Sequence, residues 1–257
     1  MQAYSLHGRV ALVTGASRSI GIGAAIAREL ARGGADVFTT FYRAYDASMP
    51  WGSTRSEADD LIAELVALGV RAGGIELNLA EPTAPATLFD RAESMFGAVD
   101  ILINNATHSE PTGIDVLDAA QLDRHYAVNL RATALLCAEF TRRHRGTPGG
   151  RIINLSSGQG KEPMPAELAY VATKGAIEAF TVSLSAALAA RGITVNAIDP
   201  GATDTGWMTP ALKQSLEAGA PMRRIGQPED AARLVRFLVS DEAGWITGQI
   251  IYSRGGL

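Results

Sequence analysis

The chain has 257 residues, a length that suits one large α/β domain better than two small ones. Hydrophobic residues make up 47% and charged residues 19%, so a sizeable core can form and disorder is not expected. The net charge of −4 lacks the basic footprint of a nucleic-acid-binding protein, and the single cysteine, Cys137, excludes an internal disulfide or a cysteine-based metal cluster.

Short apolar runs alternate with segments of helical periodicity along the whole chain. Strands are expected at residues 10–13, 36–41, 74–77, 99–103, 151–155, 193–198 and 249–252. Helices are expected at about 24–31, 57–68, 85–96, 122–143, 168–190 and 229–239. This alternation predicts an α/β fold, a Rossmann-like doubly wound parallel sheet of about seven strands with helices on both faces. A ligand is then expected beyond the carboxyl ends of the strands.

A glycine-rich segment joins the first expected strand to the first expected helix. It reads Thr14-Gly15-Ala16-Ser17-Arg18-Ser19-Ile20-Gly21-Ile22-Gly23. Glycines at this point permit a tight turn and allow backbone N–H groups to approach a pyrophosphate at a helix N-terminus. A flexible turn without a ligand would have the same composition, but the position between strand and helix favours dinucleotide binding.

This loop resembles the T-G-x-x-x-G-x-G loop of the classical short-chain dehydrogenase/reductase family. Either Ser19 replaces the middle glycine, or Gly21-Ile22-Gly23 corresponds to the family's G-I-G with two residues inserted before it. The insertion is preferred because the following helix stands at the family's usual offset from Gly23. The resemblance implies coenzyme contacts from a set of loop residues, namely Gly15, Ser17, Arg18, Gly21, Ile22 and Gly23.

The end of the second strand separates NAD from NADP in dinucleotide-binding folds, since a carboxylate binds the ribose 2′-OH and a cation binds a 2′-phosphate. No carboxylate precedes Asp46 here, whereas Arg43 stands close to the cation of the family's NADP-binding members and Arg18 is a second candidate. NADP(H) is therefore preferred, with NAD(H) left open, because both arginines could instead be solvated. By resemblance, Asn78 and Leu79 contact the adenine, and Asn105 and Ala106 lie beside the coenzyme.

The pair Tyr170 and Lys174 supplies the sharpest indication of chemistry. Residues four apart share one face of a helix, so the phenol and the ammonium can address one site. A free tyrosine has a pKa of about 10, and lowering it by about three units requires roughly 4 kcal/mol, of which Lys174 could supply part. By resemblance, Ser157 binds the substrate oxygen, in preference to Ser156, and Asn129 holds a water in a proton relay.

The resemblance covers nearly the whole chain and implies hydride transfer at nicotinamide C4, with Tyr170 as general acid or base. Lys174 would also hold the nicotinamide ribose, while Pro200, Gly201 and Thr203 would lie near the nicotinamide amide. The chain is thus expected to form a single dinucleotide-binding catalytic domain, 1–257, with a variable substrate lid at about 204–222. One departure is Arg254, where many members carry Asp before two glycines.

Partners are less clearly indicated. Arg142, Arg143 and Arg145 end a long helix, where a solvated cap is the default interpretation. Resemblance to 3-oxoacyl-[acyl-carrier-protein] reductases suggests instead a patch that docks an acidic carrier protein. The family also implies a homotetramer or homodimer formed through helices 122–143 and 168–190.

A dinucleotide sensor and an enoyl reductase fit the sequence less well than a ketone reductase. A dinucleotide sensor without turnover would not need Ser157, Tyr170 and Lys174, and an enoyl reductase would separate its tyrosine and lysine by six residues rather than three. The four scattered histidines predict no metal site. Without a signal peptide or an apolar run of eighteen residues, a cytoplasmic protein with a small carbonyl or alcohol substrate is expected, without nucleic-acid or membrane partners.

Overall fold

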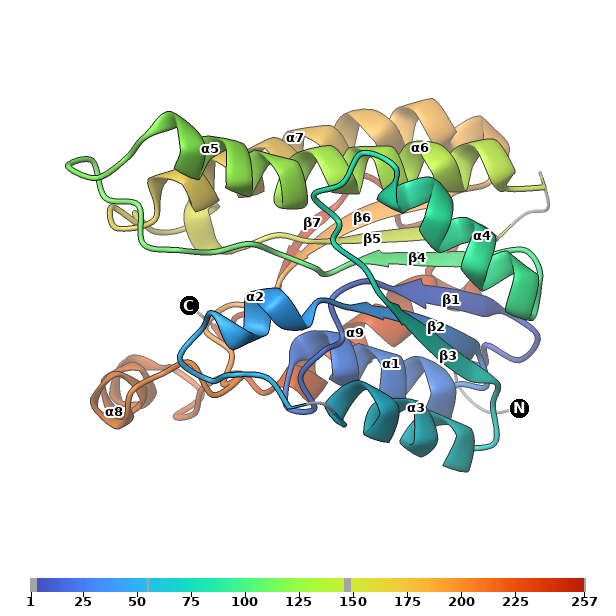
Figure 1. Ribbon diagram of the computed structural model, residues 1–257, viewed down its shortest axis with the longest axis horizontal. Helices are drawn as coiled ribbons and strands as arrows, with labels where there is room; N and C mark the ends of the chain where they lie inside the picture. Colours follow the sequence, from blue (N-terminus) through green and yellow to red (C-terminus); the bar gives the residue numbers. More distant parts are fainter. Residues whose placement is uncertain (1–3, 55, 146–148, 257) are drawn as a thin grey trace.

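A computed structural model describes residues 4–54, 56–145 and 149–256. Its strands form one parallel sheet in the order β3-β2-β1-β4-β5-β6-β7 (Figure 1). The strands are β1 (Val10–Val13), β2 (Asp36–Phe41), β3 (Ala72–Glu76), β4 (Ile101–Asn104), β5 (Arg151–Leu155), β6 (Thr194–Asp199) and β7 (Ile250–Tyr252). The order reverses between β1 and β4, which confirms the expected Rossmann-like doubly wound sheet.

Helices cover both faces of this sheet (Figure 1). One layer consists of α1 (Ile22–Arg32), α3 (Glu57–Ala67) and α9 (Pro228–Val239). The other consists of α4 (Ala84–Phe96), α5 (Ala119–His125), a π-helical segment (Tyr126–Ala132), α6 (Thr133–Arg143) and α7 (Leu168–Leu188). None of the helices in the described ranges is long and apolar enough to cross a membrane.

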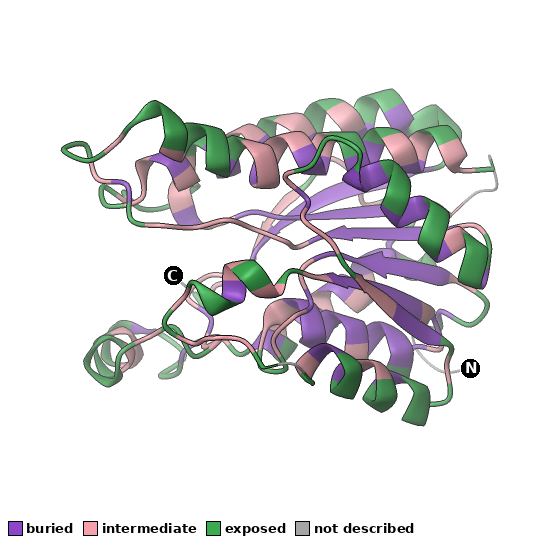
Figure 2. Ribbon diagram, viewed as in Figure 1, coloured by how far each residue is buried: buried purple, intermediate pink, exposed green. Residues whose placement is uncertain are grey.

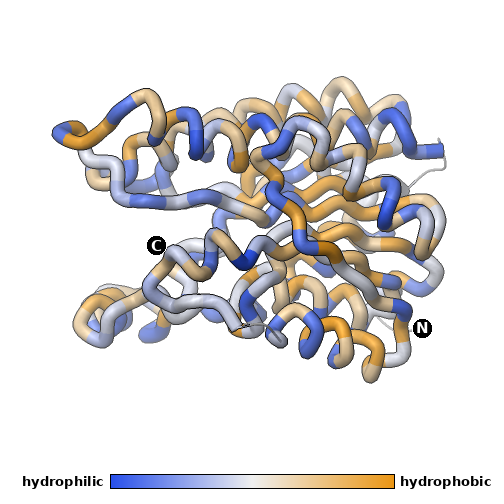
Figure 3. Tube along the Cα trace, in the orientation of Figure 1, coloured by the Kyte–Doolittle hydropathy of each residue, from blue (hydrophilic) through white to orange (hydrophobic). Residues whose placement is uncertain are grey.

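The central strands β1, β4, β5 and β6 are buried between these layers, as Figures 2 and 3 show by exposure and by hydropathy. Successive side chains of β1 enter opposite cores: Ala11 and Val13 pack with α1 and α9, whereas Val10 and Leu12 pack with α4 and α6. Alternation of this kind follows from the two-residue period of a strand. Because both faces are covered, central strands such as β1 and β4 read as nearly continuous apolar runs.

The structure contains two helices that the sequence analysis did not predict, α2 (Arg43–Ala47) and α8 (Pro210–Gly219). The first has only five residues, too few for a helical period to emerge. The second has no fully buried residue, so it lacks the apolar stripe that reveals a packed helix. Its start is nevertheless marked by Thr209, whose hydroxyl accepts from the backbone N–H of Leu212 at 3.2 Å.

Several expected boundaries differ from the observed ones by two or three residues. Helix α1 begins at Ile22 rather than at residue 24, and β3 spans Ala72–Glu76 because pairing with β2 overrides the turn propensity of its two glycines. The long helix expected at 122–143 begins at Ala119 and changes to π-helical geometry at Tyr126–Ala132. The carboxyl ends of all the strands meet at one edge, where α2, α8 and the loop after β4 also lie (Figure 1).

Candidate active site

The glycine-rich loop is built by close backbone approaches. Gly15 adopts a φ of +73°, and a Cβ there would lie 2.6 Å from the Cα of Ala106. A Cβ on Gly23 would lie 2.4 Å from the carbonyl oxygen of Gly15 and 2.6 Å from Nδ2 of Asn105. Only glycine fits at these two positions, which press the start of α1 and the loop after β4 against the loop after β1.

The loop after β4 holds the glycine-rich loop in place. Asn105 donates its side-chain amide to the carbonyl oxygens of Thr14 at 2.9 Å and Gly15 at 2.8 Å. The backbone N–H groups of Asn105 and Ala106 donate to the Thr14 hydroxyl at 3.0 and 3.1 Å. The side-chain amide of Asn105 therefore stabilises the carboxyl edge of the sheet. This is the residue that the sequence analysis expected beside the coenzyme.

The N-terminus of α1 faces this cradle without a side-chain cap. Gly21 is the N-cap residue and makes no side-chain hydrogen bond, and Ile22 is the first residue of the helix. Residues 18–21 form a turn in which the Gly21 N–H donates to the Arg18 carbonyl at 2.9 Å. This turn lies directly before Gly21-Ile22-Gly23, where the sequence analysis expected two inserted residues. The helix N-terminus has no side-chain cap, and the loop in front of it has no room for a Cβ at Gly15 or Gly23; both features fit a pyrophosphate group. Ser17 is half-buried in the same loop.

The two candidate phosphate-binding cations occupy different settings. Arg43 begins α2 and forms an exposed ion pair with Glu76, to which its Nε donates at 3.0 Å. Arg18 stacks on Trp51, with the guanidinium carbon 4.3 Å from the ring centroid, and donates to the carbonyl oxygen of Thr205. Burial lowers the pKa of Arg18, although Asp46 opposes the shift.

The expected adenine-contacting pair follows β3. The Oδ1 atom of Asn78 accepts a hydrogen bond from the Ala80 N–H at 3.0 Å and stabilises the turn that leaves the strand. Leu79 is buried in the core beneath α4. The Asn78 side chain therefore shapes the sheet end near Arg43 and Glu76.

Sequence analysis missed a contact that joins α2 to the loop after β4. The hydroxyl of Tyr45 donates to the carbonyl oxygen of Ser109 and accepts from the Ser109 N–H, both at 3.2 Å. Together with Trp51 on Arg18, this contact places residues 42–52 across the carboxyl edge of β1. An insertion was visible in the sequence, but its packing partners lie on distant loops.

Ser157, Tyr170 and Lys174 come together beyond β5. Lys174 is buried, its ammonium nitrogen lies 5.5 Å from the Tyr170 ring centroid, and it donates to the Leu155 carbonyl oxygen at 2.7 Å. Ser157 lies close enough to Tyr170 to oppose the rise in the pKa of its phenol. The neighbouring Ser156 instead donates to Glu178 at 2.7 Å, so its hydroxyl is occupied on α7.

The electrostatics of this group differ from the expectation in one respect. Desolvation of the half-buried Tyr170 side chain raises the pKa of its phenol to about 12, and Ser157 only partly opposes the rise. Burial also lowers the pKa of Lys174 to about 8. The expected lowering of the Tyr170 pKa by Lys174 is absent, because desolvation dominates and the ammonium is directed to Leu155. The phenol is therefore protonated at neutral pH.

Asn129 lies in the π-helical segment and is buried. Its Oδ1 accepts from the N–H of His108 at 2.7 Å and from the hydroxyl of Thr107 at 3.1 Å. Its Nδ2 donates to the His108 carbonyl oxygen at 2.9 Å and to the Thr173 hydroxyl at 3.1 Å. The side chain thus connects the loop after β4 to the turn of α7 that carries Tyr170 and Lys174. A π-helical turn at a functional position is a recurrent feature of proteins.

Comparisons with known proteins agree with this geometry. A family model described as "Enoyl-(Acyl carrier protein) reductase" matches residues 15–257. The chain belongs to the short-chain dehydrogenase/reductase family. It is 48% identical to the "Uncharacterized oxidoreductase YjdA" of Bacillus subtilis over 96% of both chains. It is also 34% identical to the "3-oxoacyl-[acyl-carrier-protein] reductase FabG" of Staphylococcus aureus, over 96% of this chain and 97% of the relative. A short-chain dehydrogenase from Burkholderia cenocepacia, solved in complex with NADP, matches with a TM-score of 0.87 and 35% identity over 98% of both chains.

As a short-chain dehydrogenase/reductase, the chain is an oxidoreductase, and its segment after β6 carries the predicted Pro200, Gly201 and Thr203. Gly201 adopts a φ of +66°, and its N–H donates to Asp199 at 2.8 Å. The hydroxyl of Thr203 donates to the carbonyl oxygens of Pro200 and Gly201 at 3.2 Å each. These bonds fix a compact turn at the carboxyl end of β6.

Arg254 stands where many family members carry Asp, and its side chain is buried behind this turn. Its guanidinium pairs with Glu162, and its Nε lies 3.6 Å from Oδ2 of the buried Asp199. A Cβ on Gly158 would lie 3.0 Å from Nη2 of Arg254. Burial raises the pKa of Asp199, while the Gly201 N–H and Arg254 oppose the rise. Arg254 therefore joins the C-terminal segment to the loop that follows Ser157.

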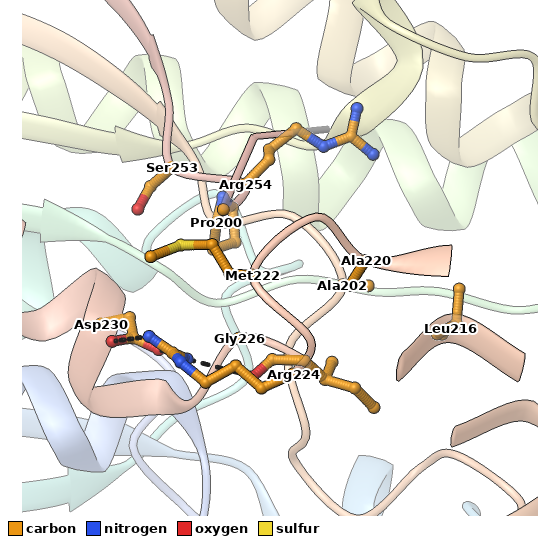
Figure 4. A pocket seen from close by; sticks show the side chains of 12 residues that line it. Pro200, Ala202, Leu216, Ala220, Met222, Arg224, Gly226, Asp230, Ser253 and Arg254 are labelled. Atoms are coloured by element: carbon orange, nitrogen blue, oxygen red, sulfur yellow. Dashed lines mark hydrogen bonds and ion pairs between the residues drawn. The ribbon is translucent and has the colours of Figure 1, made fainter. Parts of the chain in front are cut away.

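A cavity of about 210 Å³ lies between this turn, α8 and the C-terminal segment; Leu216, Ala220 and Met222 of the expected substrate lid line it, whereas the side chains of the catalytic group do not. Figure 4 shows Met222 and Leu216 lining it, with Arg224 directed at Asp230 and the Arg254 guanidinium directed away from that pair. Arg224 and Asp230 form an ion pair at 2.6 Å. The cavity is therefore lined partly by apolar side chains and partly by paired charges.

The arginine cluster at the end of α6 is largely compensated. Arg142 pairs with Glu139, and Arg143 contacts Glu139, Asp90 and Glu93. Arg145 lies beyond the helix end and is exposed. The three residues thus present less positive charge than their sequence suggests.

Proposed function

We propose that this short-chain dehydrogenase/reductase reduces a ketone, or oxidises the matching secondary alcohol, with Tyr170 as the general acid or base. The observation that carries the proposal is the convergence of Ser157, Tyr170 and Lys174 beyond one sheet edge. A tyrosine phenol is protonated at neutral pH and can therefore donate its proton to a carbonyl oxygen. A protein that only senses the dinucleotide would not need this donor.

The coenzyme is proposed to lie across the carboxyl ends of the strands. The cradle of Gly15 and Gly23 with the N-terminus of α1 would hold the pyrophosphate. Asn78 and Leu79 would border the adenine, and Asn105, Ala106 and the turn from Pro200 to Thr203 would border the remainder of the molecule. The nicotinamide supplies the hydride when it is bound.

The protein residues then divide the remaining work. In reduction, Ser157 donates a hydrogen bond that orients the carbonyl, and Tyr170 transfers its phenolic proton to the carbonyl oxygen as the alcohol forms. Lys174 would hold the nicotinamide ribose, and its charge would favour the phenolate once the ammonium turns from the Leu155 carbonyl oxygen toward Tyr170. Asn129 joins this group to the loop after β4, and to bind the water through which a proton returns its side-chain amide would have to exchange one of the four hydrogen bonds that it makes.

NADP(H) is the proposed coenzyme, with NAD(H) used less well. Arg43 stands at the end of β2 beside Asn78, where a 2′-phosphate would replace the exposed pairing with Glu76. A guanidinium favours a phosphate through charge-assisted hydrogen bonds. The solved Burkholderia relative, described in complex with NADP, supports this choice.

The substrate class within ketones is proposed from the cavity beside α8. The apolar side chains of Leu216 and Met222 favour a substrate with an apolar moiety, of which a 3-oxoacyl thioester is one example. A carrier protein docked on Arg142, Arg143 and Arg145 is less favoured, because two of these arginines are already paired with carboxylates. Activity on a carrier-bound substrate that falls steeply with added salt would support the docking.

Assembly as a homotetramer or homodimer is proposed through α5, α6 and α7. Leu135 on α6 and Val182 on α7 are exposed apolar side chains on these helices. Burying them against a second copy would remove apolar surface from water. Light scattering after size-exclusion chromatography tests this, and a wild-type monomer would contradict it.

The experiment for the proposed activity follows nicotinamide absorbance with NADPH and then NADH over ketones, 3-oxoacyl thioesters and enoyl thioesters. Ketone-dependent oxidation of NADPH, faster than that of NADH, is the expected result. Turnover of the enoyl thioesters alone would assign a different reaction to the site. Coenzyme binding without turnover on the whole panel would favour the sensor.

A further inference from the structure

Two of the chain's four histidines lie side by side, although the sequence spacing suggested that they were scattered. His108 lies in the loop after β4 and His125 ends α5, with their ring centroids 4.8 Å apart at an interplanar angle of 84°. One nitrogen of each ring and a carboxylate oxygen of Glu110 all lie within 4.8 Å of one another. We propose that these three residues bind a divalent transition metal ion of the zinc type.

The orientation of His125 suits a metal ligand. The ring is fully buried, and its Nδ1 lies 2.8 Å from the backbone carbonyl oxygen of Gln121. Because a carbonyl oxygen can only accept, Nδ1 carries the proton and Nε2 carries the lone pair, which accepts a long hydrogen bond from the Glu110 N–H at 3.4 Å that a bound ion would displace. A ligating imidazole fixed by such a hydrogen bond from its other nitrogen is the usual arrangement at metal sites.

His108 contributes a nitrogen that the protein leaves unsatisfied. Its Nε2 is shielded from solvent and has no hydrogen-bond partner among the described residues. The closest charged atom, Oε1 of Glu110, is 3.7 Å away, beyond hydrogen-bonding distance. A shielded polar atom without a partner is costly, and a metal ion would supply the missing partner.

The backbone on either side of His108 is held in place. Asn129 binds both its N–H and its carbonyl oxygen, and the ring lies 5.4 Å from that of Tyr45. Ligands on a supported backbone lose less freedom when an ion binds. The site is therefore partly organised before any ion arrives.

Two imidazole nitrogens and one carboxylate oxygen form a ligand set that zinc accepts, with a fourth position left for water. Ligand atoms on a tetrahedral zinc ion stand about 3.3 Å apart, as follows from bond lengths of about 2.0–2.1 Å. The donors must therefore draw together from their present separations of up to 4.8 Å. The Glu110 side chain, which is 30% exposed, has the freedom to make this movement.

Arg124 competes for the same carboxylate. It donates to Oε1 of Glu110 from Nε at 3.1 Å and from Nη2 at 2.7 Å. Its side chain is 49% exposed, so it can turn into solvent when an ion binds. Removing this cation should therefore strengthen metal binding, a result that adventitious binding elsewhere on the chain would not give.

The test titrates chelator-treated protein with Zn²⁺ by calorimetry. We expect one ion per chain, at least tenfold weaker binding in both His108→Gln and His125→Gln, and tighter binding in Arg124→Gln. His7→Gln is the matched control, because His7 is exposed and lies outside the group, and its affinity should equal that of the wild type. Substitution with Co²⁺ should produce the intense visible bands of a tetrahedral site in the wild type.

Absence of saturable Zn²⁺ binding to the wild type would overturn the proposal. Binding that keeps its affinity in both histidine variants would also overturn it, since the ion would then lie elsewhere. Circular dichroism checks that each variant is folded. If the buried His125→Gln variant does not fold, the half-buried His108→Gln variant and the loss of its Co²⁺ bands decide the question.

Discussion

The ammonium group of Lys174 donates a hydrogen bond to the carbonyl oxygen of Leu155 at 2.7 Å, in a position shielded from water. This contact joins α7, which carries Tyr170, to the end of β5, which leads into Ser157. Keeping a charge there is costly, because burial lowers the pKa of Lys174 to about 8. The cost amounts to about 3 kcal/mol at pH 7, where the group is charged in both the folded and the unfolded chain.

Lys174→Met should therefore raise the free energy of unfolding at pH 7 by about 2 kcal/mol, after the lost hydrogen bond to Leu155 is deducted. The folded pKa is below the unfolded value, so wild-type stability rises between about pH 8 and 10.5 as the folded chain releases this proton first. The advantage of the variant should shrink over that range. Urea unfolding at several pH values measures it, and a variant less stable at pH 7 would contradict the assigned burial cost.

Gly23→Ala should abolish coenzyme binding, because its Cβ would stand 2.4 Å from the Gly15 carbonyl oxygen and force the loop apart. A loss of at least tenfold in affinity is expected from a displaced pyrophosphate cradle. Gly219→Ala is the matched control, since a Cβ there meets nothing within 4 Å. Fluorescence titration with NADPH provides the measurement. Equal affinity of both variants would show that the loop does not hold the coenzyme.

Arg43→Ala should raise the KM for NADPH about tenfold and leave the KM for NADH nearly unchanged, since one charge-assisted contact to phosphate is lost. Glu76→Gln should have the opposite effect on NADPH by releasing Arg43 from its ion pair. Arg71→Ala removes a comparable exposed cation that pairs with Asp36 and serves as the control. Parallel losses with both coenzymes would mean that Arg43 does not contact the 2′-phosphate.

Arg254→Met should lower the free energy of unfolding by about 3 kcal/mol, because it leaves the buried carboxylate of Asp199 without its cation. The double variant Asp199→Asn with Arg254→Met should recover most of that loss, since the oxygen of the introduced side-chain amide would still accept from the Gly201 N–H. A double-mutant cycle by thermal or urea unfolding quantifies the coupling. Strictly additive effects would show that the two charges do not interact.

Much of the fold could be predicted because both faces of the sheet are covered. Strands such as Ile101–Asn104 and Arg151–Leu155 then appear as short apolar runs between helical segments. Helices α2 and α8 could not be predicted, since one is a single turn and the other has no fully buried residue. Hydrophobic periodicity in a sequence arises from the buried face of a helix, so it does not reveal helices that bury few side chains.

The candidate site, like the fold, could be predicted only in part. Tyr170, Lys174 and Ser157 follow from spacing and resemblance, because one helix and one strand end carry them. The contacts of Tyr45 with Ser109 and of His108 with His125 depend on how distant loops meet, which spacing does not encode. The rise in the Tyr170 pKa in the chain without coenzyme could not be read from spacing either, since desolvation of the phenol depends on the folded chain.

The most direct test of the central claim compares Tyr170→Phe with the wild type on the ketone that the wild type reduces fastest. Tyr126→Phe serves as the control, because its exposed phenol lies outside the site. Loss of general-acid catalysis should lower kcat by about 10²–10⁴-fold in Tyr170→Phe, with NADPH affinity nearly unchanged. Wild-type kcat in a folded, NADPH-binding Tyr170→Phe variant would contradict the assignment of Tyr170 as the proton donor.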